Sequence, residues 1–224
     1  MTTASKILEF YSSLQPDWEL PGGIDLLFPF NNEDTWNCVE RFYSKYFSDT
    51  QIRRLILGIN PGRFGAGITG IPFTDPKILE GACGIDNPFP KKNELSAIFI
   101  YEMIDAYGGK EVFYKDYFIS SICPLGFVKD GVNINYYDEK ALYEAVRQKM
   151  VDKMWDQLNV GIKRDVGFSL GKGTNYKYLK KLNEEYGFFE KVIPLPHPRW
   201  IMQYRRKQKE KILEEIVKTL KSVL

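Results

Sequence analysis

A glycine-rich segment with an asparagine near one end and an aromatic residue at the other is the part of the sequence best suited to chemistry. Residues 55–73 read LILGINPGRFGAGITGIPF, so a short apolar run breaks at Asn60 and Pro61 and closes on Phe73. Glycine lets a ligand approach the backbone closely, and glycine-rich strand-to-helix turns often bind phosphate. The segment lacks both the lysine ending of a P-loop and the glycine spacing of a dinucleotide-binding motif. Its spacing therefore fits a ligand-binding loop and equally a loop that only turns the chain.

His197 is the only histidine, and it lies between two prolines, Pro196 and Pro198. This arrangement presents the ring rigidly after a predicted strand. A neutral imidazole can donate a hydrogen bond to a leaving group that becomes anionic. A single histidine is also often structural, so the pattern alone leaves both roles open.

A run of basic residues follows the histidine, in the segment RWIMQYRRKQKEK. Interleaved with Trp200 and Tyr204, it contains Arg199, Arg205, Arg206, Lys207, Lys209 and Lys211. Such a run is usually a solvated helix face. Here it adjoins the histidine and contains aromatic residues, so a polyanion that reaches a site at His197 would account for both features.

Apolar runs alternate with helical periodicities, which predicts an α/β fold with a central four-stranded parallel sheet and helices on both faces. The predicted strands lie within residues 53–59, 116–127, 164–173 and 189–198, and an Asp-Gly pair predicts a small hairpin over residues 127–134. Parallel sheets bind ligands at the carboxyl ends of their strands. We therefore expect the loops at residues 60–62, 121–124 and 196–198 to converge on one edge.

Length and composition indicate one domain over residues 1–224, with the helices of residues 1–50 packed on its core. The chain has 44% hydrophobic residues and a net charge of +2, which only weakly suggests an anionic partner. The three cysteines, Cys38, Cys83 and Cys123, form no CxxC pair and with one histidine make a poor metal site, so we expect reduced thiols and no metal. The sequence shows no signal peptide and no apolar run of membrane-spanning length. We expect a cytoplasmic monomer that does not bind membranes.

Several motifs together resemble the uracil-DNA glycosylase superfamily, and within it the single-strand-selective monofunctional uracil-DNA glycosylases, as a divergent bacterial branch. The family pattern G-M-N-P-G-P-F-G followed by T-G-V-P-F-G is similar to GINPGRFG at residues 58–65 and TGIPFT at residues 69–74. The family's H-P-S-P-R is similar to HPRW at residues 197–200, and its N-L-C-P-L to SICPL at residues 121–125. The order of motifs agrees from about residue 53 onward.

The resemblance implies a monofunctional DNA glycosylase of base-excision repair. Such an enzyme flips a uracil out of single- or double-stranded DNA and hydrolyses its bond to the sugar. By this resemblance Asn60 positions the attacking water, and His197 stabilises the charge that develops on uracil O2. The resemblance implies no cofactor, no metal and no lysine that would form a Schiff base with the sugar.

The same resemblance assigns residues to the base and to DNA. Phe73 stacks on the flipped base, backbone near Ile59 hydrogen-bonds its edge, and Gly62 and Gly65 leave room around the ring and sugar. Arg199 would contact DNA in place of the arginine of the family's longer wedge loop. The basic run adds Arg205, Arg206 and Lys207 as DNA-contacting residues, although these could equally form a solvated face. Arg63 replaces a family proline and adds charge near the mouth of the site.

Ser121 stands where the family has an asparagine that reads two atoms of uracil. A serine offers a single hydroxyl, so we hypothesise that hypoxanthine and xanthine are also accepted. The strand phase leaves open whether Ser120 or Ser121 faces the pocket.

Two other classes of function compete with this interpretation. A non-catalytic nucleic-acid-binding module on the same fold would bind DNA without releasing a base. A nucleotide-binding α/β enzyme would use the glycine turns for phosphates, although the first turn lacks the P-loop lysine.

Overall fold

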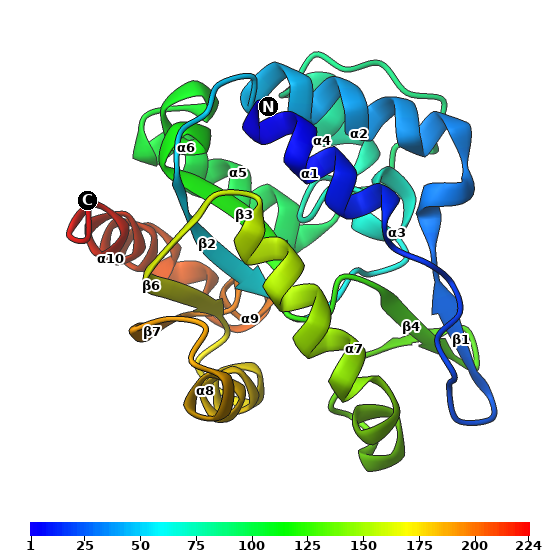
Figure 1. Cartoon of the computed structure of the whole chain (residues 1–224). Coiled ribbons are helices and arrows are strands. Elements are labelled where there is room, and N and C mark those ends of the chain that lie inside the picture. The colour runs from blue at the N-terminus through cyan, green and yellow to red at the C-terminus, as the bar shows by residue number, and fades with distance from the viewer.

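Four parallel strands form the central sheet, which confirms the predicted fold class. The computed structural model describes all 224 residues and is shown in Figure 1. The strand order is β3-β2-β6-β7, and each neighbouring pair is parallel. The strands are β2 (Arg53–Gly58), β3 (Tyr117–Ser121), β6 (Ile162–Leu170) and β7 (Lys191–Leu195). The carboxyl ends of β2 and β7 are therefore on the same edge of the sheet.

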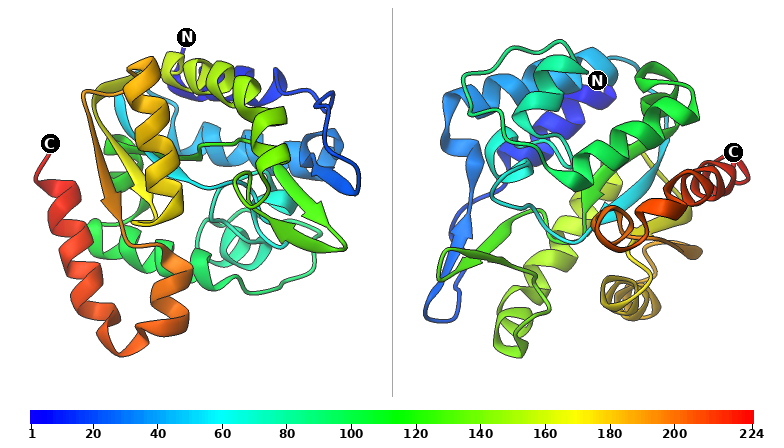
Figure 2. Two further views of the ribbon diagram at one scale, coloured as in Figure 1. Left: turned by 90° about the horizontal axis from the view of Figure 1, so that it is seen from below. Right: turned by 180° about the vertical axis from the view of Figure 1, so that it is seen from behind.

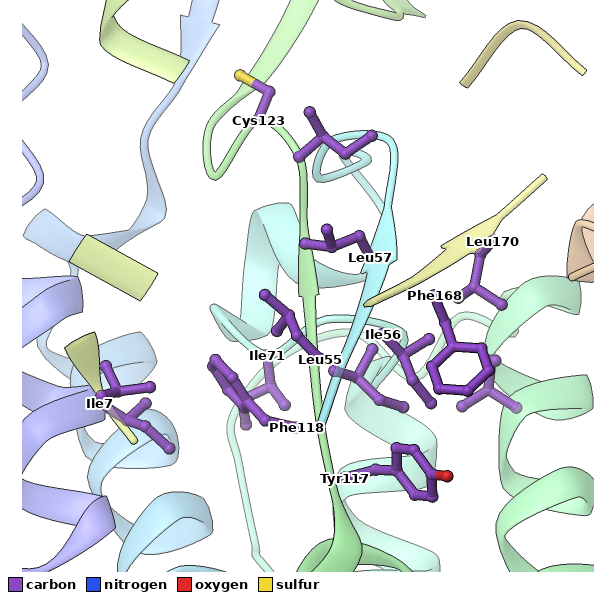
Figure 3. Close-up of a cluster of buried hydrophobic side chains, with 14 of the residues drawn as sticks. Ile7, Leu55, Ile56, Leu57, Ile71, Tyr117, Phe118, Cys123, Phe168 and Leu170 are labelled. Carbon is purple, nitrogen blue, oxygen red and sulfur yellow. The ribbon is translucent and has the colours of Figure 1, made fainter. Parts of the chain in front are cut away.

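β2 is an inner strand, and its side chains are buried on both faces of the sheet. Leu55, Ile56 and Leu57 have no exposed surface. In Figure 3, Leu55 lies on the same side of the sheet as Phe118, and Ile56 lies on the side of Phe168. A strand covered on both faces has apolar residues at successive positions, which explains why the sequence predicts the location of β2.

Two arginines begin β2, although the strand is buried. The Arg53 guanidinium donates to the Gln51 carbonyl at 2.8 Å and to the Asp49 carboxylate at 2.9 Å. Arg54 is paired with Asp165 on β6 at 2.6 Å. Burying a charge is costly unless it is paired and hydrogen-bonded, and both guanidinium groups meet that condition.

Helices cover both faces of the sheet, as Figures 1 and 2 show. On one side lie α1 (Thr3–Ser12), α2 (Glu33–Tyr46) and α7 (Lys140–Asn159). On the other lie α5 (Leu95–Tyr107), α9 (Pro198–Tyr204) and α10 (Lys209–Lys221). The remaining helices are α3 (Ala66–Thr69), α4 (Pro76–Gly81), α6 (Lys110–Asp116), α8 (Thr174–Tyr186) and the 3-10 turns η1 (Pro29–Asn31) and η2 (Arg206–Gln208). None of the helices combines the length and apolar character needed to cross a bilayer.

The first two helices pack together and meet the sheet through aromatic rings. Tyr11 of α1 stacks on Tyr43 of α2 with ring centroids 5.5 Å apart. Tyr43 and Phe47 in turn contact Phe118 of β3 edge-on or nearly so. Aromatic pairs of this geometry contribute about 0.5–1.5 kcal/mol beyond their buried area.

A second, antiparallel sheet has the order β1-β4-β5 and was only partly predicted. It consists of β1 (Ile24–Leu27), β4 (Gly126–Lys129) and β5 (Val132–Ile134). The predicted hairpin is the β4–β5 pair, and its turn residues Asp130 and Gly131 both have positive φ, at 50° and 71°. β1 joins this hairpin from far away in the sequence. The sheet brings the end of β5 against the loop that follows β2.

Gly126 at the start of β4 allows the second sheet to lie close to the loop that follows β2. A Cβ atom at Gly126 would overlap the Pro61 carbonyl oxygen and lie 3.1 Å from Leu27 Cβ. We therefore expect Gly126→Ala to displace the loop after Asn60 and to lower the free energy of unfolding by about 1–3 kcal/mol. Urea denaturation measures this change. Gly22→Ala is the matched control because nothing lies within 4 Å of a Cβ there; equal stability of the two variants would contradict the close approach.

Candidate active site

A cavity of about 430 Å³ lies at the carboxyl ends of β2 and β7. The loop after β2 contributes Asn60 and Gly62, and the segment after β7 contributes His197 and Arg199. Phe73 forms another part of the wall. Two of the three predicted loops therefore converge on one site and bring Asn60 and His197 together, with the Phe73 ring beside them.

The Asn60 amide is held at both ends. Its Oδ1 accepts from the Tyr136 backbone N–H at 3.1 Å, and its Nδ2 donates to the Ile134 carbonyl at 3.2 Å. Both partners lie at or just after β5, so the second sheet orients the amide. An amide oxygen has two lone pairs, and the Tyr136 bond uses one of them. The other remains available to hold a water.

His197 is a neutral hydrogen-bond donor in this structure. Its Nδ1 accepts from the Arg199 backbone N–H at 3.2 Å, at the start of α9, so the ring proton lies on Nε2. Burial, together with the nearby positive charge of Arg199, lowers the pKa of His197 to about 4. The ring is therefore uncharged near neutral pH and offers Nε2–H to a ligand.

Phe73 has a strained backbone. Its φ of 54° lies in the left-handed region, and only one other non-glycine residue of the chain, Asp130, has a positive φ. Thr69 stabilises the turn, because its hydroxyl donates to the Thr74 carbonyl at 2.6 Å and accepts from the Ile71 N–H at 3.2 Å. Such strain costs about 1–3 kcal/mol and is concentrated at functional sites.

The ring of Phe73 lies against the bare backbone at the end of β2. A Cβ atom at Gly58 would be 2.9 Å from Phe73 Cε2 and 3.0 Å from Cζ. Only glycine leaves the ring this space. The first glycine of the glycine-rich segment and the aromatic residue at its end are thus in direct contact.

Ile59 and Gly62 line the cavity, whereas Gly65 does not. The Ile59 carbonyl accepts from the Cys123 N–H at 3.1 Å, and the Ile59 N–H has no backbone acceptor among the turn and loop hydrogen bonds. A Cβ at Gly62 would lie 3.2 Å from Asn133 Nδ2. At Gly65 the space is filled by the carboxylate of Glu94. The predicted substrate contact of Gly65 remains a prediction, and the structure gives this glycine a different neighbour.

Ser121 lies outside the wall of the cavity. It is buried at the end of β3, and its carbonyl accepts from Gln157 Nε2 at 3.3 Å. Ser120 is equally buried and does not line the cavity either. The backbone pairing continues past Ser121, through Ile122 N–H to the Gly58 carbonyl at 3.0 Å, which keeps this serine within the sheet. The role of Ser121 in reading the base stays a prediction.

Sequence reasoning missed several polar residues of the cavity. Asn133 and Asn135 come from the hairpin sheet, and Glu94 precedes α5. Gln203 was recoverable, since it lies four residues after Arg199 on α9 and therefore on the same helix face. Burial and the neighbouring Asp75 raise the pKa of Glu94 to about 7, while Arg199 opposes that rise. The structure contains no cluster of three or more histidine, cysteine, aspartate or glutamate side chains arranged to hold a metal ion.

Cations without acidic partners follow His197 in the chain, and one of them, Arg199, lines the cavity. Four exposed residues of the segment after β7 form no salt bridge: Arg199, Arg205, Arg206 and Lys207. The Arg205 guanidinium lies 5.0 Å from the ring centroid of Trp200, and Trp200 is itself 42% exposed. On the loop after β2, Phe64 is 41% exposed. Its ring centroid lies 4.6 Å from the Arg63 guanidinium carbon and 5.1 Å from Lys92 Nζ. Exposed aromatic rings among unpaired cations are suited to a nucleic acid strand.

This combination of fold and site defines a DNA glycosylase, and comparisons with known proteins agree. The model of the Uracil DNA glycosylase superfamily matches residues 44–221, and the chain belongs to that superfamily. It is also similar to wild-type SMUG2 from Pedobacter heparinus, whose crystal structure it matches with a TM-score of 0.96 and 46% sequence identity. The match covers 100% of this chain and 98% of that one. The resemblance expected from the motifs is confirmed, and DNA is the partner of this family.

The neutral state of His197 is directly measurable because the chain has one histidine. We expect ¹⁵N spectra of histidine-labelled protein to show a protonated Nε2 and an acceptor Nδ1, unchanged from about pH 8 to about pH 5. The pKa of about 4 places protonation of the folded protein below this range, whereas the stability that the neutral ring contributes falls as the pH decreases from 6.5 to about 4. Titration near the ordinary value of 6.5 would contradict the described environment.

The contact between Gly58 and Phe73 gives a second prediction for the site. We expect Gly58→Ala to push the Phe73 ring aside and to slow base release roughly 10–100-fold, since small misplacements in a site are costly. Gly81→Ala is the control, because no atom lies within 4 Å of a Cβ there. Single-turnover release rates measure the effect. A Gly58→Ala enzyme as fast as Gly81→Ala would show that the ring position does not matter.

Proposed function

We propose that this protein removes uracil from DNA by hydrolysing the bond between base and sugar, and that it also removes xanthine and hypoxanthine. The observation that carries the proposal is the placement of Asn60, Phe73 and a neutral His197 around one cavity. These are the three residues to which the motif resemblance gives roles at the base. Arg199, which forms no salt bridge, lines the cavity, and further unpaired cations follow it in the chain, which suits a DNA strand.

The geometry supports a division of labour among the three residues. Phe73 offers a flat apolar face to a base taken out of the stack. Asn60, with one free lone pair, holds a water without removing its proton. His197 donates Nε2–H to the base oxygen that gains negative charge as the bond breaks, and the neutral ring does so without first taking up a proton.

The proposed range of bases follows from the polar groups of the cavity. Ser121 does not line it, so the two-point amide contact that the family uses to select uracil has no counterpart at that position. Deaminated bases share a carbonyl where the parent base had an amine. A site that reads this carbonyl by single contacts, such as the Ile59 N–H, discriminates less among them.

The proposal also covers the oligomeric state, the cell compartment and the strandedness of the DNA substrate. We propose that the protein acts as a monomer in the cytoplasm, on single- or double-stranded DNA. The exposed ring of Trp200 and the cations beside it support contact with unpaired bases and phosphates.

Base release from labelled oligonucleotides tests the proposed function. Oligonucleotides with one uracil, xanthine or hypoxanthine are incubated without metal and then treated with alkali to cut abasic sites. We expect release by the wild type, and at least a tenfold loss in both Asn60→Ala and His197→Ala; a tenfold loss corresponds to about 1.4 kcal/mol of barrier.

Asn159→Ala provides the control, since this exposed asparagine ends α7 and lies outside the cavity. DNA binding without release of any of the three bases would refute the proposal and favour a non-catalytic binding module. Release of uracil alone would restrict it to a single base.

A further inference from the structure

Glu94 is the only acidic side chain that lines the cavity. It lies just before α5, and its carboxylate makes no capping bond to the first turn of that helix. Instead the carboxylate lies over the loop that follows Asn60. There it occupies the space that a side chain at Gly65 would need, and Oε1 is 4.0 Å from the Cβ position of Gly62. The glycine at position 65 thus makes room for a carboxylate.

A buried carboxylate fixes the position of Glu94. Asp75 has no exposed surface and accepts the Glu94 backbone N–H at 2.9 Å through one oxygen. Its other oxygen accepts the Ile78 N–H at 2.8 Å and caps α4. Asp75 lies two residues after Phe73. The segment that carries the aromatic ring therefore also anchors Glu94, which makes the carboxylate a positioned part of the site.

The other two polar residues assigned to the reaction cannot take up a proton. An amide such as Asn60 has no basic site near neutral pH. His197 already carries its proton on Nε2, and its Nδ1 is occupied by the Arg199 N–H. Hydrolysis nevertheless releases a proton from water. Among the side chains of the cavity, Glu94 is the group whose ordinary chemistry is to accept one.

We propose that Glu94 is the general base of the reaction and accepts a proton from the water that Asn60 holds. This inference rests on the proposed function. In the step, the water oxygen forms a bond to the sugar C1′ while the C1′–N bond breaks. The electron pair of that bond leaves with the base, which His197 stabilises by hydrogen bonding. The water proton passes to the Glu94 carboxylate and from there to solvent.

The charges around Glu94 suit this role. Burial and the facing carboxylate of Asp75 raise its pKa to about 7, and the facing guanidinium of Arg199 opposes the rise. A base is most effective when its pKa lies near the working pH. The ionised fraction of such a group increases about tenfold between pH 6 and pH 8. His197 does not titrate in this range.

The test is the pH dependence of single-turnover base release. The proteins compared are the wild type, Glu94→Gln, Glu94→Asp and the exposed control Glu215→Gln. We expect the wild-type and control rates to rise about tenfold from pH 6 to pH 8. Glu94→Gln should lose at least tenfold at pH 8 and show no rise, because an amide accepts no proton. Glu94→Asp should be intermediate and keep the rise.

Thermal unfolding shows whether Glu94→Gln folds. An acid with a raised pKa binds more protons in the folded state, so its ionisation lowers stability as pH increases from 4.5 to about 7. We therefore expect Glu94→Gln to increase the melting temperature more at pH 8 than at pH 5.

Three outcomes would overturn the role of Glu94. A Glu94→Gln enzyme with the wild-type rate and profile would exclude it from the reaction. A slower Glu94→Gln enzyme that keeps the rise with pH would make Glu94 a positioning residue only. Absence of release by the wild type from uracil, xanthine and hypoxanthine would refute the proposed function itself, and with it this step.

Discussion

The contact between the Phe73 ring and the bare backbone of Gly58 is the constraint on which the site depends. β2 is an inner strand, buried on both faces, so its end cannot move without disturbing the core. The ring can lie against that end only because position 58 has no side chain. The backbone of Phe73 adopts φ 54° to bring it there, at a cost of about 1–3 kcal/mol. Binding a flat base on a ring held in place in advance avoids ordering it during the reaction.

The protonation states of His197 and Glu94, the two titratable groups discussed beside this ring, each have a structural cause. His197 stays neutral because it is buried near a cation, and its tautomer is set by the first turn of α9. Glu94 becomes a stronger base than an ordinary carboxylate because it is buried and faces Asp75. Arg199 on the cavity wall and the cations that follow it form no salt bridge, so their charge remains available for the phosphates of the proposed DNA substrate. Together these groups place donors, an acceptor and positive charge where the proposed reaction needs them.

Much of this arrangement could be predicted from the sequence. Buried parallel strands read as apolar runs, and their alternation with helices gives the sheet. Because the ends of parallel strands share an edge, Asn60 and His197 were expected to meet, and the cavity brings them together. The motif spacing also identified Phe73, although its strained backbone is visible only in the structure.

Other features depend on contacts that no local pattern reports. Glu94 reaches the site because a buried Asp75 binds its backbone, and a lone glutamate before a helix gives no signal of this. β1 joins the hairpin from a distant part of the chain. Arg54 lies in a buried strand because Asp165 pairs with it across the sheet. Ser121 matches the motif by alignment, but the continued pairing of its strand keeps it out of the cavity wall.

Stacking of the base on Phe73 is tested most directly by a crystal structure with an oligonucleotide that carries 2′-fluoro-2′-deoxyuridine, whose bond to the base resists hydrolysis. We expect an extruded uracil in van der Waals contact with the Phe73 ring, about 3.5–4 Å away. Asn60 would hold a water near C1′, and His197 Nε2 would lie at hydrogen-bond distance from uracil O2. A uracil that remains stacked in the strand, or binds away from Phe73, would contradict the role of this ring.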